Sequence, residues 1–341
     1  MIEPPPPPNL FEWTPAAPPP RPAGVADSLT VKLRPSRHPV CLECGGLTDD
    51  DGYCQSCGAR VPTPREHFEA APVAWVGGVC DRGRQHHRNE DALALWAAAE
   101  PELRAVLVVC DGVSSSQDSD VAALAGAEAA RDLLAQRQPD GVGVPASRDA
   151  AMADVLVEAA AAANTAVIAH TAATSQNAAS ATFAAAVVRD DEIHYANLGD
   201  SRVYWLGAAT RVQLSVDHSA AEELIRAGST RAEAEASPQA HAITRWLGRD
   251  AEDIVPATGV HRITEDGWLL VCSDGLWNYA SGAADLGAQL DAALVEGPEP
   301  VAVARRLVAW ANAQGGRDNI TVALAHVPAT LHESPATTAE R

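Results

Sequence analysis

Two aspartates stand where apolar stretches of the sequence end. The run 107–112 reads L-V-V-C-D-G and ends on Asp111 and a glycine, and the run 268–275 reads W-L-L-V-C-S-D-G and ends on Asp274 and a glycine. An apolar run rich in β-branched residues predicts a buried strand, and the following glycine lets the backbone turn away. Each strand would therefore deliver one carboxylate to a sheet edge, where the two could share a site.

Further acidic residues lie in short motifs beside glycine or asparagine. They are Glu90 and Asp91 in R-N-E-D, Asp200 in L-G-D-S-R and Asp318 in G-R-D-N. Carboxylates that lie close together repel each other unless a cation neutralises them, and ligation by oxygen alone selects hard ions such as Mg2+ or Mn2+. A pair of such ions about 4 Å apart activates water for attack on phosphorus. The motifs together favour a metal site, although any single one could be an ordinary turn carboxylate.

Four of the seven cysteines form a separate cluster near the N-terminus. They follow the pattern C-x2-C, nine residues, C-x2-C, and are Cys41, Cys44, Cys54 and Cys57. Two thiolate pairs at this spacing predict one structural Zn2+ in a zinc-ribbon-like module, and a redox C-x-x-C pair is the alternative. Because a module of about 25 residues cannot fold on its own core, the metal is expected to stabilise it.

The composition restricts the class of protein. Of the 341 residues 47% are hydrophobic, enough for a large core, and the net charge is −20. That charge argues against binding to nucleic acid or to an anionic membrane. We find no apolar run near the ~20 residues of a membrane span and no secretory signal, so the sequence predicts a cytoplasmic protein.

The order of proline-rich, polar and apolar segments along the chain predicts one large domain with further segments on either side of it. The predicted parts are a disordered Pro-rich tail (1–37), the zinc-ribbon-like module (38–61), a linker (62–71), the main domain (72–328) and a C-terminal tail (329–341). Strands are predicted at 72–80, 104–110, 181–188, 192–198, 202–206, 268–273 and 319–327, with 181–206 as a meander. Helices are predicted at 120–138, 151–170, 284–295 and 300–314, and a polar insertion or flap at 215–250.

Six ordered motifs resemble the metal-dependent (type 2C) serine/threonine protein phosphatases in their bacterial form. They read R-N-E-D-A, C-D-G, L-G-D-S-R, D-H-S, C-S-D-G-L-W and G-G-R-D-N-I-T, and the similarity covers about residues 72–328. The resemblance implies an α+β fold, a four-layer αββα sandwich of two antiparallel sheets flanked by helices. It implies in-line hydrolysis of phosphoserine and phosphothreonine in proteins by a hydroxide that bridges two Mn2+ or Mg2+ ions. Kinase substrates, or the kinase itself, would be the phosphorylated partners.

The resemblance also assigns roles to the acidic residues. Asp111 would bridge the two metal ions and act in catalysis with Asp274. Asp274 and Asp318 would hold the first ion, whereas Glu90 and the backbone carbonyl of Gly112 would bind the second.

Three more residues receive roles from the same resemblance. Asp91 would orient metal-coordinated water. Asp200 would help to bind a third, weaker ion that bacterial members hold. Asn319 would tie down the last ligand loop.

The sequence departs from the family pattern at the place of the phosphate-gripping arginine. Family members usually have this arginine four residues before the glutamate, and here His86 stands there. One of Arg82, Arg84 and Arg88 could substitute, because a guanidinium fork is not replaced by an imidazole without loss. Alternatively, His86 and His87 bind the phosphate or donate a proton to the leaving oxygen.

A second departure is the run D-G-V-S-S-S, where the commoner form is glycine-rich. The hydroxyls of 114–116 either support the metal ligands or form a turn. Neither departure removes a metal ligand, so the sequence predicts an active enzyme.

Two other functions compete with this interpretation. One is a catalytically weak phosphopeptide-binding or regulatory module with the same fold, which only His86 supports. The other is a two-metal nuclease, which the acidic charge disfavours. The zinc-ribbon-like module and the Pro-rich tail are candidate sites for a protein partner.

Overall fold

The computed structural model describes residues 41, 44–99, 103–113, 116, 118–137, 139 and 144–329. The chain divides into residues 1–34 and residues 35–341, and every described residue belongs to the second part. The predicted Pro-rich tail, and all but the first residue of the predicted C-terminal tail, lie outside the described residues.

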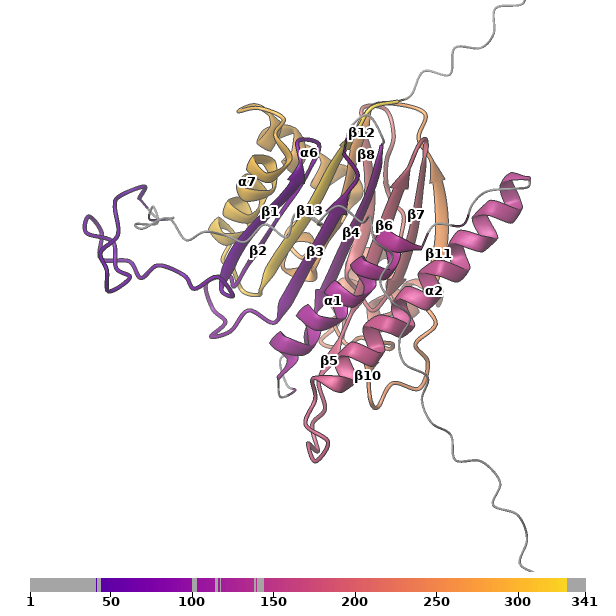
Figure 1. Ribbon diagram of the computed structural model, residues 1–341, viewed down its shortest axis with the longest axis horizontal. Coiled ribbons are helices and arrows are strands. Elements are labelled where there is room, and N and C mark those ends of the chain that lie inside the picture. Colours follow the sequence, from indigo (N-terminus) through magenta and orange to yellow (C-terminus); the bar gives the residue numbers. More distant parts are fainter. Residues whose placement is uncertain are drawn as a thin grey trace, which may run out of the picture. The chain divides into compact units, whose positions relative to one another are not determined.

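Two antiparallel sheets form the centre of the main domain (Figure 1). The six-stranded sheet has the order β1 (His67–Val73), β2 (Val76–Asp81), β13 (Ile320–Val327), β12 (Gly267–Cys272), β8 (Arg202–Gly207) and β9 (Arg211–Gln213). The five-stranded sheet has the order β11 (Ala257–Arg262), β7 (Glu192–Leu198), β6 (Phe183–Arg189), β4 (Arg104–Asp111) and β3 (Asp91–Ala97). A short ladder joins β5 (Ser180–Ala181) to β10 (Leu247–Gly248).

The central strands are apolar on both faces because both faces are covered. In β4, Leu107 and Val109 pack between the two sheets, whereas Val106, Val108 and Cys110 pack under helices. Side chains of a strand point alternately to opposite faces, so an unbroken apolar run is what a strand in a middle layer needs. The same division holds for β6, β12 and β13.

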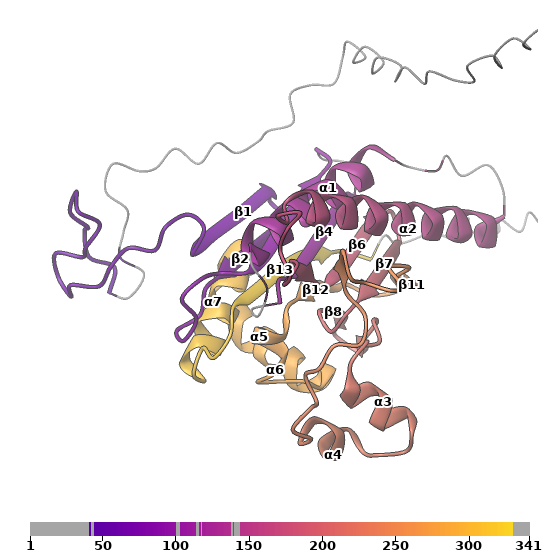
Figure 2. The same ribbon diagram turned by 90° about the horizontal axis from the view of Figure 1, so that it is seen from below.

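Helices cover the outer face of each sheet (Figure 2). The five-stranded sheet is covered by α1 (Ser119–Gln136) and α2 (Pro145–Ala169). The six-stranded sheet is covered by α5 (Asp274–Trp277), α6 (Ala283–Leu294) and α7 (Pro300–Ala313). The predicted four-layer αββα sandwich is therefore confirmed.

Helix α2 is the one described helix whose length and apolar composition would allow it to cross a membrane. The sequence analysis had found no run of that kind, because alanines supply most of its apolar character. Its inner side chains, including Met152 and Leu156, are fully packed in the core beside the five-stranded sheet. A core helix of a folded domain passes the same test of length and composition.

The predicted insertion at 215–250 contains two short helices, α3 (Ala220–Arg226) and α4 (Arg231–Glu235). Each begins at a hydroxyl side chain that accepts a backbone N–H, Ser219 for α3 and Thr230 for α4. Figure 2 shows both helices on the far side of α5 and α6 from the sheets.

Some predicted strands were wrong in extent or placement. The predicted strand 72–80 is a hairpin of β1 and β2, and β1 starts within the predicted linker. The predicted meander breaks at its third strand, because β8 pairs in the other sheet. Neither β3 nor β11 was predicted, and both are edge strands. The residues of β11 are exposed or half-buried, which weakens the apolar pattern of that strand.

Candidate active site

Four aspartates lie at one rim of the sandwich. Asp111 ends β4 and is paired directly with Asp91, the first residue of β3. Asp274 follows β12 and Asp318 precedes β13, and these two strands are antiparallel neighbours. Each sheet therefore brings two carboxylates to the rim, because the end of one strand lies beside the start of its antiparallel neighbour.

The carboxylates are close enough to perturb one another strongly. Burial, followed by the negative charges of Asp91, Asp274, Asp318 and Asp200, raises the pKa of Asp111 well above its usual value. Burial raises the pKa of Asp91 to about 7, with Asp318 and Asp274 adding to the rise. Burial and the charge of Asp318 raise the pKa of Asp274 to about 7. Five acidic groups thus share one electrostatic centre, in which burial and mutual repulsion outweigh the opposing charge of Arg202 on Asp200 and Asp274.

Two buried oxygens of this centre lack a hydrogen-bond donor. The Oδ2 atom of Asp91 accepts from the hydroxyls of Ser273 and Thr321, at 2.6 and 2.8 Å. The Oδ1 atoms of Asp91 and Asp274 are buried and have no partner among the described residues. A buried oxygen left in this way is costly unless another group satisfies it, and a divalent cation binds such oxygens. The residues therefore fit hard divalent ions.

Asp200 lies in the turn between β7 and β8, where the chain passes from one sheet to the other. The backbone carbonyl of Asp200 accepts a hydrogen bond from the indole Nε1 of Trp277 at 2.9 Å. Asp200 is only 4% exposed. Burial, then the charges of Asp274 and Asp217, raise the pKa of Asp200 well above its usual value. The structure thus places Asp200 beside Asp274 at the edge of the centre.

Glu90 joins the rim from the loop before β3. Its Oε1 atom accepts from Arg88 Nη2 at 2.7 Å and from the hydroxyl of Ser119 at 2.5 Å. Its backbone carbonyl accepts from the N–H of Gly112 at 3.1 Å. A Cβ on Gly112 would lie 2.7 Å from that carbonyl, so only glycine allows this approach. Glu90 and Gly112 are therefore held side by side.

The loop that contains His86 is fixed against Asp318. The Nε2 atom of His86 lies 3.3 Å from Asp318 Oδ1. Gly83 has a φ of +72°, and a Cβ there would lie 2.0 Å from the carbonyl oxygen of Asp318. The N–H of Arg84 donates to Gly316 O at 2.8 Å. His86 thus lies beside Asp318, and its contact with that carboxylate distinguishes it from a free surface residue.

The three neighbouring arginines point in different directions. Arg82 donates to the carbonyl of His86 at 2.6 Å, and Arg84 donates to the carbonyl of Asn312 at 3.1 Å. Arg88 alone of the three contacts an acidic residue of the centre, Glu90. His87 is exposed.

The serines after Gly112 are only partly described. Ser114 and Ser115 lie outside the described residues. Ser116 is buried and its hydroxyl donates to Val113 O at 2.6 Å. For Ser116 the structure therefore supports the turn-forming role.

Several residues around the centre had no predicted role. Ser273 and Thr321 lie within the motifs C-S-D-G and D-N-I-T, so their hydroxyls could have been recognised as candidate donors. Arg65 donates from Nη2 to the carbonyls of Asp91 and Asp120, at 2.7 and 2.9 Å. It lies in the predicted linker, where no local pattern distinguishes it.

The four cysteines of the N-terminal module converge. Their Sγ atoms all lie within 4.8 Å of one another, with 3.7 Å between Cys41 and Cys57 and 3.4 Å between Cys44 and Cys54. Four thiolates around one Zn2+ at about 2.3 Å stand about 3.8 Å apart. The backbone N–H groups of Cys57 and Ser56 lower the pKa of Cys54 to about 6, despite partial desolvation. The donor set and its geometry suit a tetrahedral zinc ion.

Comparisons with known proteins bear on this geometry. The sequence profile of protein phosphatase 2C matches residues 82–320. The protein phosphatase PhpP of Streptococcus pneumoniae is 38% identical over 145 residues, which cover 42% of this chain and 56% of that protein. The serine/threonine phosphatase stp of Listeria innocua is 29% identical over 246 residues, covering 72% of this chain and 92% of that protein.

A solved structure shares the fold over nearly its full length. The serine/threonine phosphatase PstP/Ppp of Mycobacterium tuberculosis superimposes with a TM-score of 0.61 and 25% identity, covering 77% of this chain and 99% of that one. The matched region begins after the cysteine module, since the family profile starts at residue 82.

Proposed function

The chain belongs to the protein phosphatase 2C family, and on that premise we propose that it hydrolyses phosphoserine and phosphothreonine in proteins with Mn2+ or Mg2+ as cofactor. The observation that supports this most strongly is the group of buried aspartates with raised pKa values and unpartnered Oδ1 atoms at one rim of the sandwich. Such a group is unfavourable by itself and becomes favourable with cations.

The proposed ligands follow the geometry of the rim. The charges of Asp91, Asp274 and Asp318 all act on Asp111, which supports its contact with both ions. Asp274 and Asp318 would bind the first ion, and Glu90 and the Gly112 carbonyl would bind the second. When bound, the ions would supply an activated water and neutralise charge on the phosphoryl group.

Two residues at the outer edge would complete the ligand set. Asp91 would accept a hydrogen bond from water through its unpartnered Oδ1. Asp200 would help Asp274 to bind a third ion.

We propose that two basic side chains contact the phosphoryl group. Arg88 and His86 each contact a carboxylate of the centre, and their side chains are 47% and 28% exposed. Both therefore face the solvent side, from which a phosphorylated residue must approach. We assign phosphate binding to Arg88, and to His86 a hydrogen bond at Nε2 with the phosphate or the leaving oxygen.

The described cysteines that precede the rim aspartates are poorly suited to act as nucleophiles. Cys110 and Cys272 precede Asp111 and Asp274 but are fully buried, and burial raises the pKa of both thiols. A thiol kept protonated is a poor nucleophile. This supports direct attack by water over a covalent phosphoenzyme.

The cysteine module is proposed to bind one structural Zn2+ through Cys41, Cys44, Cys54 and Cys57. Four thiolates leave no open position for a substrate, so this metal would stabilise the module only. The test is zinc content by mass spectrometry of the native protein: wild type is expected to hold one zinc ion and Cys54→Ser to lose it. A disulfide in the native protein would contradict the proposal.

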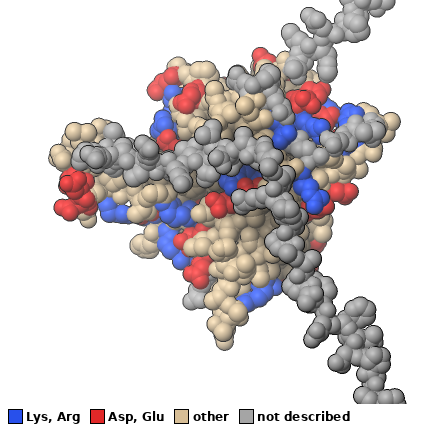
Figure 3. Space-filling view, in the orientation of Figure 1, with Lys and Arg blue, Asp and Glu red and all other residues tan. Residues whose placement is uncertain are grey.

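A cytoplasmic location and phosphorylated protein substrates of a Ser/Thr kinase complete the proposal. On the face shown in Figure 3, acidic and basic side chains of the described residues are interspersed, which supports a protein substrate better than nucleic acid.

The proposal is tested by phosphate release from a phosphothreonine peptide, measured with full-length protein in Mn2+ and in EDTA. Turnover should require the metal and should fall by at least about a thousandfold in Asp274→Asn, as expected when a group that stabilises transition-state charge is removed. If the protein binds the peptide with Mn2+ present but releases no phosphate, the chain is a phosphopeptide-binding module of the same fold.

A further inference from the structure

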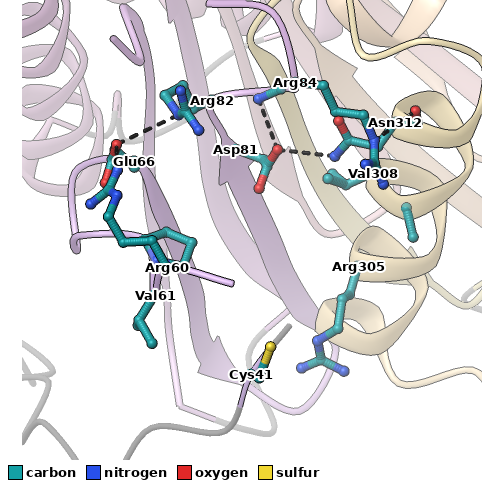
Figure 4. Close-up of a pocket in the computed structure, with 13 residues that line it drawn as sticks. Cys41, Arg60, Val61, Glu66, Asp81, Arg82, Arg84, Arg305, Val308 and Asn312 are labelled. Atoms are coloured by element: carbon teal, nitrogen blue, oxygen red, sulfur yellow. Dashed lines mark hydrogen bonds and ion pairs between the residues drawn. The ribbon is translucent and has the colours of Figure 1, made fainter. Parts of the chain in front are cut away.

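A hollow of about 320 Å³ lies between the cysteine module and the main domain (Figure 4). Its charged lining residues are Arg60, Arg82, Arg84, Arg305, Glu66 and Asp81. A second hollow, of about 520 Å³, shares Arg60, Arg82 and Arg84 with the first. We call the two hollows together the basic cleft.

Most charges in the basic cleft are already paired. Arg60 contacts Glu66, and Arg305 binds both carboxylate oxygens of its neighbour Glu69 at 2.7 Å. Asp81 lies 2.6 Å from Nδ1 of His67.

His67 is expected to be charged at neutral pH. Burial alone lowers the pKa of His67, but hydrogen bonds to Asp81 and Glu69 outweigh it and raise that pKa to about 9. Asp81 therefore adds no net negative charge to the basic cleft.

Two arginines remain without a full counter-charge. Arg82 Nε lies 3.6 Å from Glu66, a carboxylate that Arg60 already neutralises. Arg84 is exposed and forms no ion pair with any carboxylate of the described residues; its Nε donates only to the carbonyl of Asn312. In a protein of net charge −20, such a local excess of positive charge indicates a binding site for an anion.

The basic cleft is joined to the metal centre by its own lining residues. Arg82 donates to the carbonyl of His86, and the backbone N–H of Arg84 donates to Gly316, two residues before Asp318. Four residues of chain from Arg82 to His86 span at most about 14 Å. An extended substrate covers that distance in about four residues, since each adds about 3.3 Å.

We propose that the basic cleft binds an anionic side chain, acidic or phosphorylated, that flanks the phosphorylated residue of the substrate within about four positions. The cysteine module forms one side of the basic cleft through Cys41, Cys57 and Arg60, so a bound side chain would lie against it. This inference rests on the proposed phosphatase function and adds the substrate class.

The test compares phosphothreonine peptides that differ only in the flanking residues: neutral, glutamate-rich, or with a second phosphoserine. The ratio of kcat/KM for each anionic peptide to kcat/KM for the neutral one is measured for wild type and Arg84→Gln. The wild-type ratio should be about five or more. Arg84→Gln should reduce this ratio toward one, because the substitution removes one partly exposed, charge-assisted contact with the substrate. A larger ratio for the second phosphoserine than for glutamate would identify phosphate as the preferred anion.

Two further variants separate recognition from folding. Arg84→Glu should reverse the preference, so that a lysine-flanked peptide becomes the better substrate, which a misfolded protein cannot show. Arg137→Gln removes an exposed arginine paired with Glu158 and should keep the wild-type ratio. A wild-type ratio near one, with metal-dependent hydrolysis of the neutral peptide intact, would overturn the inference but leave the phosphatase proposal standing. No hydrolysis of any peptide would overturn both.

Discussion

The backbone N–H of Glu90 donates to the side-chain Oδ1 of Asn319 across 2.7 Å, although 229 positions separate the two residues. The Nδ2 atom of Asn319 donates in turn to the carbonyls of Arg82 and Arg88, at 2.8 and 3.0 Å. The buried side-chain amide of Asn319, the residue after Asp318, thus binds the loop before β3. The first and the last acidic motifs of the centre are held in register by this side chain.

Asn319→Ala should destabilise the protein and weaken its response to metal. The change leaves one buried N–H and two carbonyls without partners, which costs about 2–3 kcal/mol in the free energy of unfolding. Urea unfolding with and without Mn2+ measures both effects. The control is Asn164→Ala, which removes a hydrogen bond to Gly248 away from the rim and should leave the stabilisation by Mn2+ unchanged. An equal metal response in both variants would contradict the role given to Asn319.

Asp274→Asn should stabilise the metal-free protein while it abolishes activity. The pKa of Asp274 is about 7 in the folded state, above its unfolded value of about 4. The metal-free protein therefore loses stability as pH rises from about 4 through 7 and Asp274 ionises. At pH 8 the substitution removes that cost, and a gain of about 1 kcal/mol raises Tm by about 2–4 °C. Thermal unfolding in EDTA at pH 5 and pH 8 tests this. A lower Tm than wild type at pH 8 would mean that the aspartates do not repel one another.

The positions of the rim aspartates could be predicted because these residues end or begin buried strands. Asp111 and Asp274 come at the ends of apolar runs whose strands are covered on both faces by other layers of the sandwich. Because both faces are buried, nearly every residue of these strands is apolar, and the strands can be recognised in the sequence. The four long helices α1, α2, α6 and α7 were predicted within a few residues for the same reason, except at the start of α2, where Pro145 begins the helix ahead of its apolar pattern. The short helix α5 was not predicted.

Other features depend on contacts between distant segments and could not be predicted. The switch of β8 to the second sheet follows from pairing with β12, about 65 positions away in the sequence. The hydrogen bonds of Arg65 likewise join a segment with no local pattern to the start of β3 and the first turn of α1. The polar strand β1 was read as linker because its residues are only partly buried.

His67 should make stability depend on alkaline pH. Despite burial, hydrogen bonds to Asp81 and Glu69 raise its pKa to about 9 in the folded state, above the unfolded value of about 6.5. The stabilisation is therefore complete below pH 6.5 and is lost as pH rises through 9. The urea midpoint of wild type should fall between pH 6.5 and 9 more steeply than that of His67→Gln. Parallel curves for the two proteins would contradict the prediction.

The buried pair of Arg202 and Asp217 should be the most sensitive ion pair in the domain. The two side chains are 2% and 4% exposed, lie 2.7 Å apart, and the guanidinium stacks 3.5 Å from the ring centroid of Trp277. Asp217→Asn leaves a buried charge without its partner and should cost about 3–5 kcal/mol.

An exposed pair provides the matched control for this substitution. Asp132 pairs with Arg131 at 2.7 Å and is 60% exposed, so Asp132→Asn should change stability by no more than about 0.5 kcal/mol. Denaturant unfolding of both variants gives the comparison, and similar losses would show that burial does not set the strength of the Arg202–Asp217 pair.

The central claim is that the rim aspartates hold the divalent ions. The most direct measurement is a Mn2+ titration followed by electron paramagnetic resonance, on wild type and Asp111→Asn whose cysteine modules are already loaded with Zn2+. Because the charges of Asp91, Asp274 and Asp318 all act on Asp111, we expect at least two bound Mn2+ ions in wild type and the loss of tight binding of both in Asp111→Asn. Equal Mn2+ binding by the two proteins would show that the ions bind elsewhere and would contradict the account.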